Sequence, residues 1–240
     1  MNISSFPVRL ISAAVLTFAA TAANAAFTFS TVATSGNSNT AAQTYATSVS
    51  GARDTFGDLT INDPTPLGGS VSRTVYPGPA TYTLTTQTNL YSVQSPGIGG
   101  PAVSVENNSD TLTFSNFGGV GPEGIRNFGA SFYLSELTAS NAVGGLMSVK
   151  ATDVNNLTQT FTYTQGASGA GNAPTLYFTL GSTVALQSVE LIGPNAIGST
   201  SNTFATVDNV VVGAVPLPAA GWLLISGLGG MGLFKRRRRA

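Results

Sequence analysis

The sequence predicts an all-β fold, an antiparallel β-sandwich of the jelly-roll type. Apolar and polar residues alternate with period two in many short segments, and breaks rich in Gly, Pro and Asn separate these segments. No helical periodicity persists for three turns. Two antiparallel sheets packed face to face would bury the apolar side of each strand. About 190 residues lie between two apolar ends of the chain, which suits a single domain.

The alternation indicates ten or more short strands. In chain order they are marked by Phe27/Phe29, Val71/Arg73/Val75, Tyr82/Leu84, Leu90 to Val93, Val103/Val105, Leu112/Phe114, Phe132/Leu134, Leu157/Gln159/Phe161/Tyr163, Leu176/Phe178/Leu180, Val189/Leu191 and Val210/Val212. The breaks at 63–69, 96–101, 118–124 and 166–174 end strands and supply turns. Ser35–Thr44 and Gly193–Asn202 are polar and without periodicity, so we expect exposed loops there.

One segment shows the alternation with hydroxyl residues. Its polar positions are Thr158, Thr160, Thr162 and Thr164, and its larger residues are Leu157, Phe161 and Tyr163. Because successive side chains of a strand point to opposite faces, we expect the hydroxyls on one face and the larger residues on the other.

Residues 1–25 have the pattern of a secretory signal peptide. Arg9 is the only charged residue, an apolar run follows at 10–20, and Ala23 and Ala25 form a small-x-small cleavage site. We expect export through the Sec translocon and cleavage by signal peptidase after Ala25. The alternative is a buried helix of the domain.

The C-terminal segment 213–240 has three parts. They are the proline motif Val215, Pro216, Leu217 and Pro218, the apolar stretch 219–234, and the basic cluster Lys235, Arg236, Arg237, Arg238 and Arg239. The apolar stretch would form a helix of about 24 Å, slightly short of the ~30 Å hydrocarbon core. The positive-inside rule keeps the basic cluster in the cytoplasm and the middle of the chain outside. A nucleic-acid patch would need interleaved aromatics, which the cluster lacks, so no nucleic-acid partner is expected.

These three parts, in this order, resemble the C-terminal signal of the PEP-CTERM proteins of Gram-negative bacteria. The resemblance covers residues 215–240, and Leu217 stands where the family usually has Glu. It implies recognition by an exosortase, a membrane-embedded cysteine protease or transpeptidase that supplies its own catalytic residues. Cleavage near the proline motif would release the protein from a transient inner-membrane anchor to the cell surface or exopolysaccharide matrix. The alternative is a retained membrane anchor.

Two segments within the predicted domain, residues 26–212, carry a second resemblance. Residues 127–134 and 204–213 are similar to strands of PEP-CTERM ectodomains of jelly-roll or lectin-like type. This resemblance implies that the last strand returns beside the first.

The absence of His and Cys excludes much enzyme chemistry. Disulfides, zinc sites of the usual ligand types, Cys–His nucleophiles and a Ser-His-Asp triad all require these residues. Glycoside hydrolysis needs only two carboxylates. The eligible glutamates are Glu106, Glu123, Glu136 and Glu190, and none lies in a recognisable signature. A Ser-x-x-Lys nucleophile is absent, because Met147 precedes Lys150 by three residues. We therefore predict that the protein is not an enzyme.

Two kinds of binding site are left open by the sequence. Asp54, Asp58 and Asp63 lie close together in the chain, and Asp208 marks the last strand, so structural calcium is the one cofactor considered. The alternative is that these residues form turns. Carbohydrate binding would use exposed tyrosines among Tyr76, Tyr82, Tyr91, Tyr133, Tyr163 and Tyr177. Tyrosines in strands are more often half-buried.

The predicted function is therefore an exported, non-catalytic surface or matrix protein, with a carbohydrate-binding module or a glycoside hydrolase as alternatives. Exopolysaccharide is the expected extracellular partner. Between the two signals, four basic and ten acidic residues remain, which gives a net charge of about −6. Such a domain is poorly suited to bind polyanions.

Overall fold

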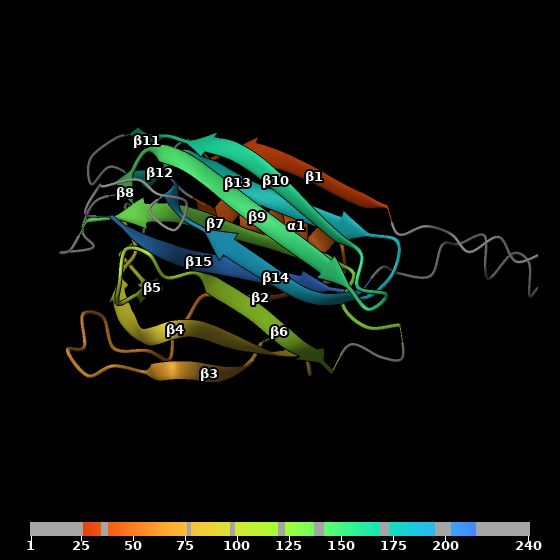
Figure 1. Ribbon diagram of the computed structural model, residues 1–240, viewed down its shortest axis with the longest axis horizontal. Coiled ribbons are helices and arrows are strands. Elements are labelled where there is room, and N and C mark those ends of the chain that lie inside the picture. The colour runs from red at the N-terminus through yellow and green to blue at the C-terminus, as the bar shows by residue number, and fades with distance from the viewer. Residues whose placement is uncertain are drawn as a thin grey trace, which may run out of the picture.

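A computed structural model describes residues 26–34, 38–75, 78–96, 99–119, 123–136, 142–168, 173–194 and 203–214. These residues form an almost entirely β structure with one helix (Figure 1). The predicted signal peptide at 1–25 and residues 215–240 of the predicted sorting signal lie outside the described residues. Within the described ranges, no helix is long and apolar enough to cross a membrane.

The all-β prediction is confirmed. The elements are β1 (Phe27–Ala33), α1 (Ser38–Ser48), β2 (Ala52–Asp54), β3 (Gly68–Thr74), β4 (Thr81–Gln94), β5 (Pro101–Val105), β6 (Leu112–Gly118), β7 (Asn127–Ser135), β8 (Ala142–Val143), β9 (Gly145–Asp153), β10 (Thr158–Gln165), β11 (Ala167–Ser168), β12 (Ala173–Pro174), β13 (Leu176–Ser182), β14 (Leu186–Ile192) and β15 (Phe204–Gly213). Nearly every residue pair used to predict a strand lies within one of them.

The described strands form one large antiparallel sheet, with β11 and β12 as a separate pair. The main path runs β1-β13-β7-β15-β5-β4-β6-β14-β9-β10, with β2 on β15, β3 on β4 and β8 on β7. The long strand β4 turns the corner of this sheet. Its first part, at 81–85, pairs with β6, and its last part, at 90–94, pairs with β5. β4 therefore joins the two halves of the sheet, which are β1-β13-β7-β15-β5 on one side and β6-β14-β9-β10 on the other.

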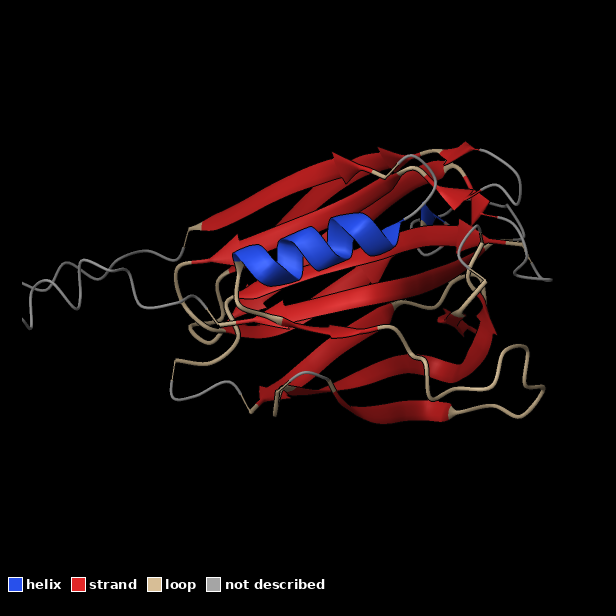
Figure 2. Ribbon diagram, turned by 180° about the vertical axis from the view of Figure 1, so that it is seen from behind, coloured by secondary structure: helices blue, strands red, loops and turns tan. Residues whose placement is uncertain are grey.

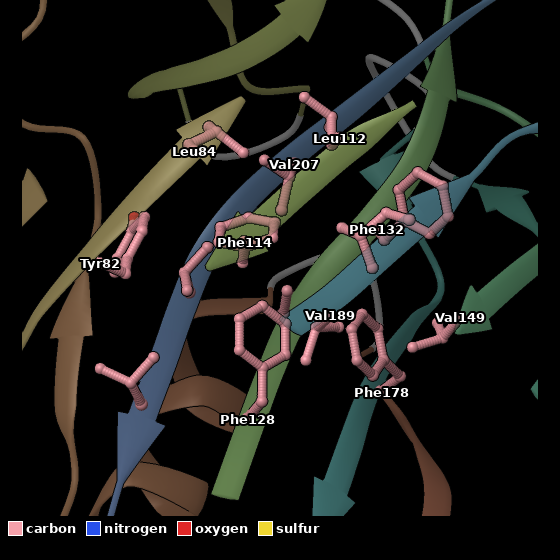
Figure 3. Close-up of a cluster of buried hydrophobic side chains, with 14 of the residues drawn as sticks. Tyr82, Leu84, Leu112, Phe114, Phe128, Phe132, Val149, Phe178, Val189 and Val207 are labelled. Carbon is pink, nitrogen blue, oxygen red and sulfur yellow. The ribbon is translucent and has the colours of Figure 1, made fainter. Parts of the chain in front are cut away.

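The two ends of the sheet meet, so the sheet is nearly closed. Phe29 of β1 stacks on Phe161 of β10 with ring centroids 4.9 Å apart, and the two strands lie side by side in Figure 1. Phe114 of β6 also faces Phe128 of β7, a strand of the other half, at 4.8 Å. Both halves thus enclose one hydrophobic core (Figure 3).

The hydroxyl alternation in β10 is confirmed in its main part. Its four threonines are exposed, whereas Tyr163 is buried and Phe161 half-buried. Leu157 is 44% exposed because the strand begins only at Thr158.

The expected position of the last strand is wrong. β15 lies between β7 and β5 and also pairs with β2, whereas β1 pairs with β13. The physical reason is burial, since every residue from Ala205 to Gly213 is buried. A strand covered on both faces belongs in the middle of a sheet rather than beside an edge strand.

The prediction of a loop over Ser35–Thr44 is also wrong for the described residues 38–44, because the helix α1 begins at Ser38. The helix lies on the outer face of the sheet, over β15, β13 and β7 (Figure 2). Its buried apolar residues are only the small Ala42 and Ala46, one turn apart. Ser, Thr, Asn and Gln fill most other positions, so no apolar stripe marks the helix in the sequence.

The end of α1 follows a known pattern. Ser50 adopts a left-handed φ of 48°. The N–H of Gly51 donates to the carbonyl of Ala46 at 2.8 Å, and the N–H of Ser50 donates to that of Thr47 at 3.4 Å. This is a Schellman motif with Ser50 in the place usually taken by Gly.

Candidate functional site

A groove of about 430 Å³ opens where β5 and β7 end and β15 begins. Its lining consists of Asn62, Asp63, Tyr91, Ser92, Val93, Ser104, Val105, Glu106, Ser135, Glu136 and Phe204. We call it the acidic groove, because Asp63, Glu106 and Glu136 are its charged residues.

Strand pairing assembles this groove from distant parts of the chain. Tyr91 of β4 pairs directly with Ser104 of β5, and Phe204 of β15 pairs with Ser135 of β7. Glu106 and Glu136 are the first residues after β5 and β7. Because β5 and β7 are both antiparallel to β15, their ends lie at the same edge of the sheet.

A chain of buried hydroxyls crosses three strands beside the groove. The Oγ of Ser135 lies 2.7 Å from Oγ1 of Thr206, which donates to Oγ of Ser104 at 2.9 Å. All three side chains are buried. Since each hydrogen bond joins a different pair of strands, these three hydroxyls fix β7, β15 and β5 relative to one another.

Ser92 adds a buried polar atom to the groove lining. Its side chain is 2% exposed, and its Oγ has no hydrogen-bond partner among the described residues. Buried hydroxyls are nearly always hydrogen-bonded in folded proteins. Its cross-strand partner is the core residue Val103, so the side chain of Ser92 lies on the core face of the sheet.

The three carboxylates of the groove face solvent without a cation. Glu106 accepts a hydrogen bond from Nδ2 of Asn89 at 2.8 Å. Asp63 accepts one from the N–H of Thr65 at 2.9 Å, and this backbone hydrogen bond lowers the pKa of Asp63. None of the three forms an ion pair with a described residue.

The cationic side chains of the described residues lie elsewhere. Arg73 pairs with Asp54 and Asp58, Arg126 with Glu123, and Lys150 with Glu190. Arg53 donates from Nη1 to the carbonyl of Asn39 at 3.2 Å. The charge of the acidic groove is therefore left uncompensated by the folded domain.

Two of the four aspartates considered as calcium ligands come together, but around Arg73. Nε of Arg73 donates to Oδ2 of Asp54 at 2.8 Å, and Nη2 donates to Oδ1 of Asp58 at 2.6 Å. The hydroxyl of Tyr82 also donates to Oδ2 of Asp54 at 2.8 Å. The hydrogen bond from Arg73 lowers the pKa of Asp58. The guanidinium carbon lies 5.2 Å from the ring centroid of Phe56.

The other two aspartates lie apart from that pair. Asp63 belongs to the acidic groove, and Asp208 is buried on β15. Asp208 accepts hydrogen bonds from Oγ of Ser95 at 2.7 Å and the N–H of Asn209 at 2.6 Å. Burial raises the pKa of Asp208 to about 7. In the part of the chain that the structure describes, no three acidic side chains lie close enough to hold a metal ion.

Most of the candidate tyrosines are not available to a ligand. Tyr82, Tyr133, Tyr163 and Tyr177 are buried, and Tyr76 lies outside the described residues. Tyr91 alone of the six lines the acidic groove. Phe204 was not predicted as a site residue, because a single aromatic residue at the start of a strand gives no local signal in the sequence.

The four candidate glutamates divide into two pairs. Glu106 and Glu136 meet at the acidic groove, whereas Glu123 and Glu190 are paired with cations elsewhere. A glycosidase needs a general acid that burial keeps protonated. Glu106 and Glu136 are both exposed.

Comparison with known proteins gives no match to a family model, to a curated protein or to a solved structure.

Proposed function

We propose that this chain is an exported, non-catalytic protein of the cell surface or extracellular matrix, and that its acidic groove binds polysaccharide. The proposal has two parts. Delivery rests on the predicted signals at the two ends of the chain, and binding rests on the groove.

For delivery, the Sec translocon, signal peptidase and an exosortase would act in turn, with the inner membrane as a transient anchor. The protein would reach the extracellular matrix of a biofilm. Its exported domain would be a β-sandwich of the jelly-roll type. Mass spectrometry of the mature protein tests it. We expect an N-terminus at Ala26 and a C-terminus near Pro216. A mature protein that keeps Arg236–Arg239 would contradict processing of the tail.

For binding, one observation carries the proposal: the groove places aromatic rings beside polar acceptors. Tyr91 and Phe204 offer apolar ring faces of the kind that pack on the C–H face of a pyranose. Glu106 and Glu136 offer carboxylate oxygens that accept hydrogen bonds from sugar hydroxyls. An open groove of apolar walls with a few polar groups is the usual form of a ligand site.

A glycan array probed with residues 26–214, which contain both hydrophobic clusters of the fold, tests this binding. We expect saturable binding that Tyr91→Ala weakens by about tenfold, a loss comparable to that of a buried aromatic anchor. Leu157→Ala is the control, because Leu157 is an exposed apolar residue that lies outside the groove. Equal loss in both variants, or no binding at all, would contradict the proposal.

The glycoside hydrolase alternative is favoured by one observation only, the meeting of Glu106 and Glu136 at one groove. Release of reducing ends from bound glycans, abolished by Glu106→Gln or Glu136→Gln, would replace binding by hydrolysis. We expect no release in either variant or in the parent protein.

A further inference from the structure

We infer that the acidic groove selects polysaccharides with free amino groups, that is, cationic amino-sugar polymers. This inference rests on the proposed binding of polysaccharide and names the chemical class of the sugar.

The negative charge of the acidic groove favours a cationic sugar. Asp63, Glu106 and Glu136 come from three different segments and converge on one groove, and none has a cationic partner among the described residues. The four cations of the described chain are all engaged away from it. A protonated amine therefore gains attraction from the carboxylates without displacing an existing ion pair. A uronic acid or sulfated polymer is repelled by the same groups.

The hydrogen-bonding groups of the lining favour the same kind of ligand. An ammonium group has three donors and no acceptor. The groove offers three carboxylates, which accept hydrogen bonds. The three donors of an ammonium group match these acceptors.

The geometry of the groove disfavours a bare metal ion. Within the described residues its carboxylates do not form a group of three that could hold one. Carboxylates spread along a groove suit instead a polymer that carries one cation on each sugar, since each ammonium can meet a different carboxylate. Tyr91 and Phe204 supply the ring faces against which the sugars pack.

Calorimetry with residues 26–214 tests the inference. The two probes are the glucosamine tetrasaccharide and its fully N-acetylated counterpart, compared at about pH 6, where amines are protonated and ordinary carboxyls ionised. We expect the glucosamine probe to bind about tenfold more tightly, and the difference to shrink between about 0.05 M and about 0.5 M NaCl as screening increases.

Variants locate the effect. Glu106→Gln and Glu136→Gln should each reduce the preference for the glucosamine probe several-fold, with little change for the N-acetylated one. Glu123→Gln is the matched control, since it removes the same charge from an exposed glutamate outside the groove. An equal loss in Glu123→Gln would mean that only the overall charge acts, and would overturn the inference.

The remaining outcomes separate the inference from the function on which it rests. Equal affinity for both sugars leaves polysaccharide binding in place and overturns the selectivity for amines. Absence of binding by either sugar overturns the inference, and absence of binding to every sugar of the glycan array overturns the proposed function itself. Oligolysine that competes as strongly as the glucosamine probe would make the groove a site for basic peptides and would overturn the assignment to amino sugars.

Discussion

The ring of Tyr45 in α1 lies directly on the backbone of Gly129 in β7. A Cβ added at Gly129 would be 2.7 Å from Cε1 of that ring and 2.8 Å from the hydroxyl of Tyr177. The hydroxyl of Tyr45 reaches past the glycine to donate to the carbonyl of Leu180 at 2.9 Å. The absence of a side chain at residue 129 is therefore what lets the helix pack on the sheet.

Gly129→Ala should destabilise the domain by about 1–3 kcal/mol, the usual cost of inserting a methyl group into a packed core. Urea unfolding followed by circular dichroism measures the change. Gly57→Ala is the control, because Gly57 is exposed and its φ is not left-handed. Similar unfolding midpoints for the two variants would show that the contact with Tyr45 is unimportant.

Removal of Arg73 should have a larger effect. Arg73→Met leaves Asp54, which is 5% exposed, as a buried carboxylate without its cation, at a cost of about 3–5 kcal/mol. Arg126→Met is the control, since its partner Glu123 is 51% exposed and such surface pairs contribute about 0–1 kcal/mol. If chemical denaturation gave the same loss for both, the buried pair would have no special role.

Asp208 should make stability depend on pH. Burial raises its pKa from 3.8 to about 7, so the folded state binds a proton that the unfolded state has lost. Stability should therefore fall as pH rises from about 4 to about 7, by up to a few kcal/mol, and level off above that range. The lowered pKa values of Asp58 and Asp63 act in the opposite direction, but only below about pH 4.

Asp208→Asn isolates this contribution, because the amide keeps the shape of the side chain and cannot ionise. Thermal unfolding at a series of pH values should show the decline in the parent protein and a flat profile in the variant. A decline of the same size in Asp208→Asn would assign it to other groups.

Removal of calcium should leave the stability unchanged. Arg73 already forms ion pairs with Asp54 and Asp58, and within the described residues Asp63 and Asp208 do not join them in a group that could hold a metal ion. We expect the same melting temperature in EDTA and in excess calcium. A rise on addition of calcium would instead support the structural calcium considered from the sequence, and the Asp54→Asn variant would then show whether this cluster provides it.

Local patterns predicted the strands, because period-two alternation records which face each residue buries. The helix α1 was not predicted, because its buried apolar residues Ala42 and Ala46 are too small to give a recognisable apolar stripe in the sequence. The acidic groove was not predicted either, for a different reason. Glu106 and Glu136 are far apart in the chain and meet through the pairing of β5 and β7 with β15. Asp63 joins them from a loop, beside Asn62, whose amide oxygen accepts from the N–H of Gln94 in β4. Such long-range pairing leaves no short motif in a single sequence.

Mapping the bound sugar on the domain by NMR tests most directly whether the acidic groove binds polysaccharide. Amide shifts of isotope-labelled residues 26–214 would be followed during titration with the glucosamine tetrasaccharide. We expect the largest shifts to cluster at Tyr91, Ser104, Glu136 and Phe204, around the acidic groove. Shifts concentrated on the exposed threonines of β10, with none at the groove, would contradict it.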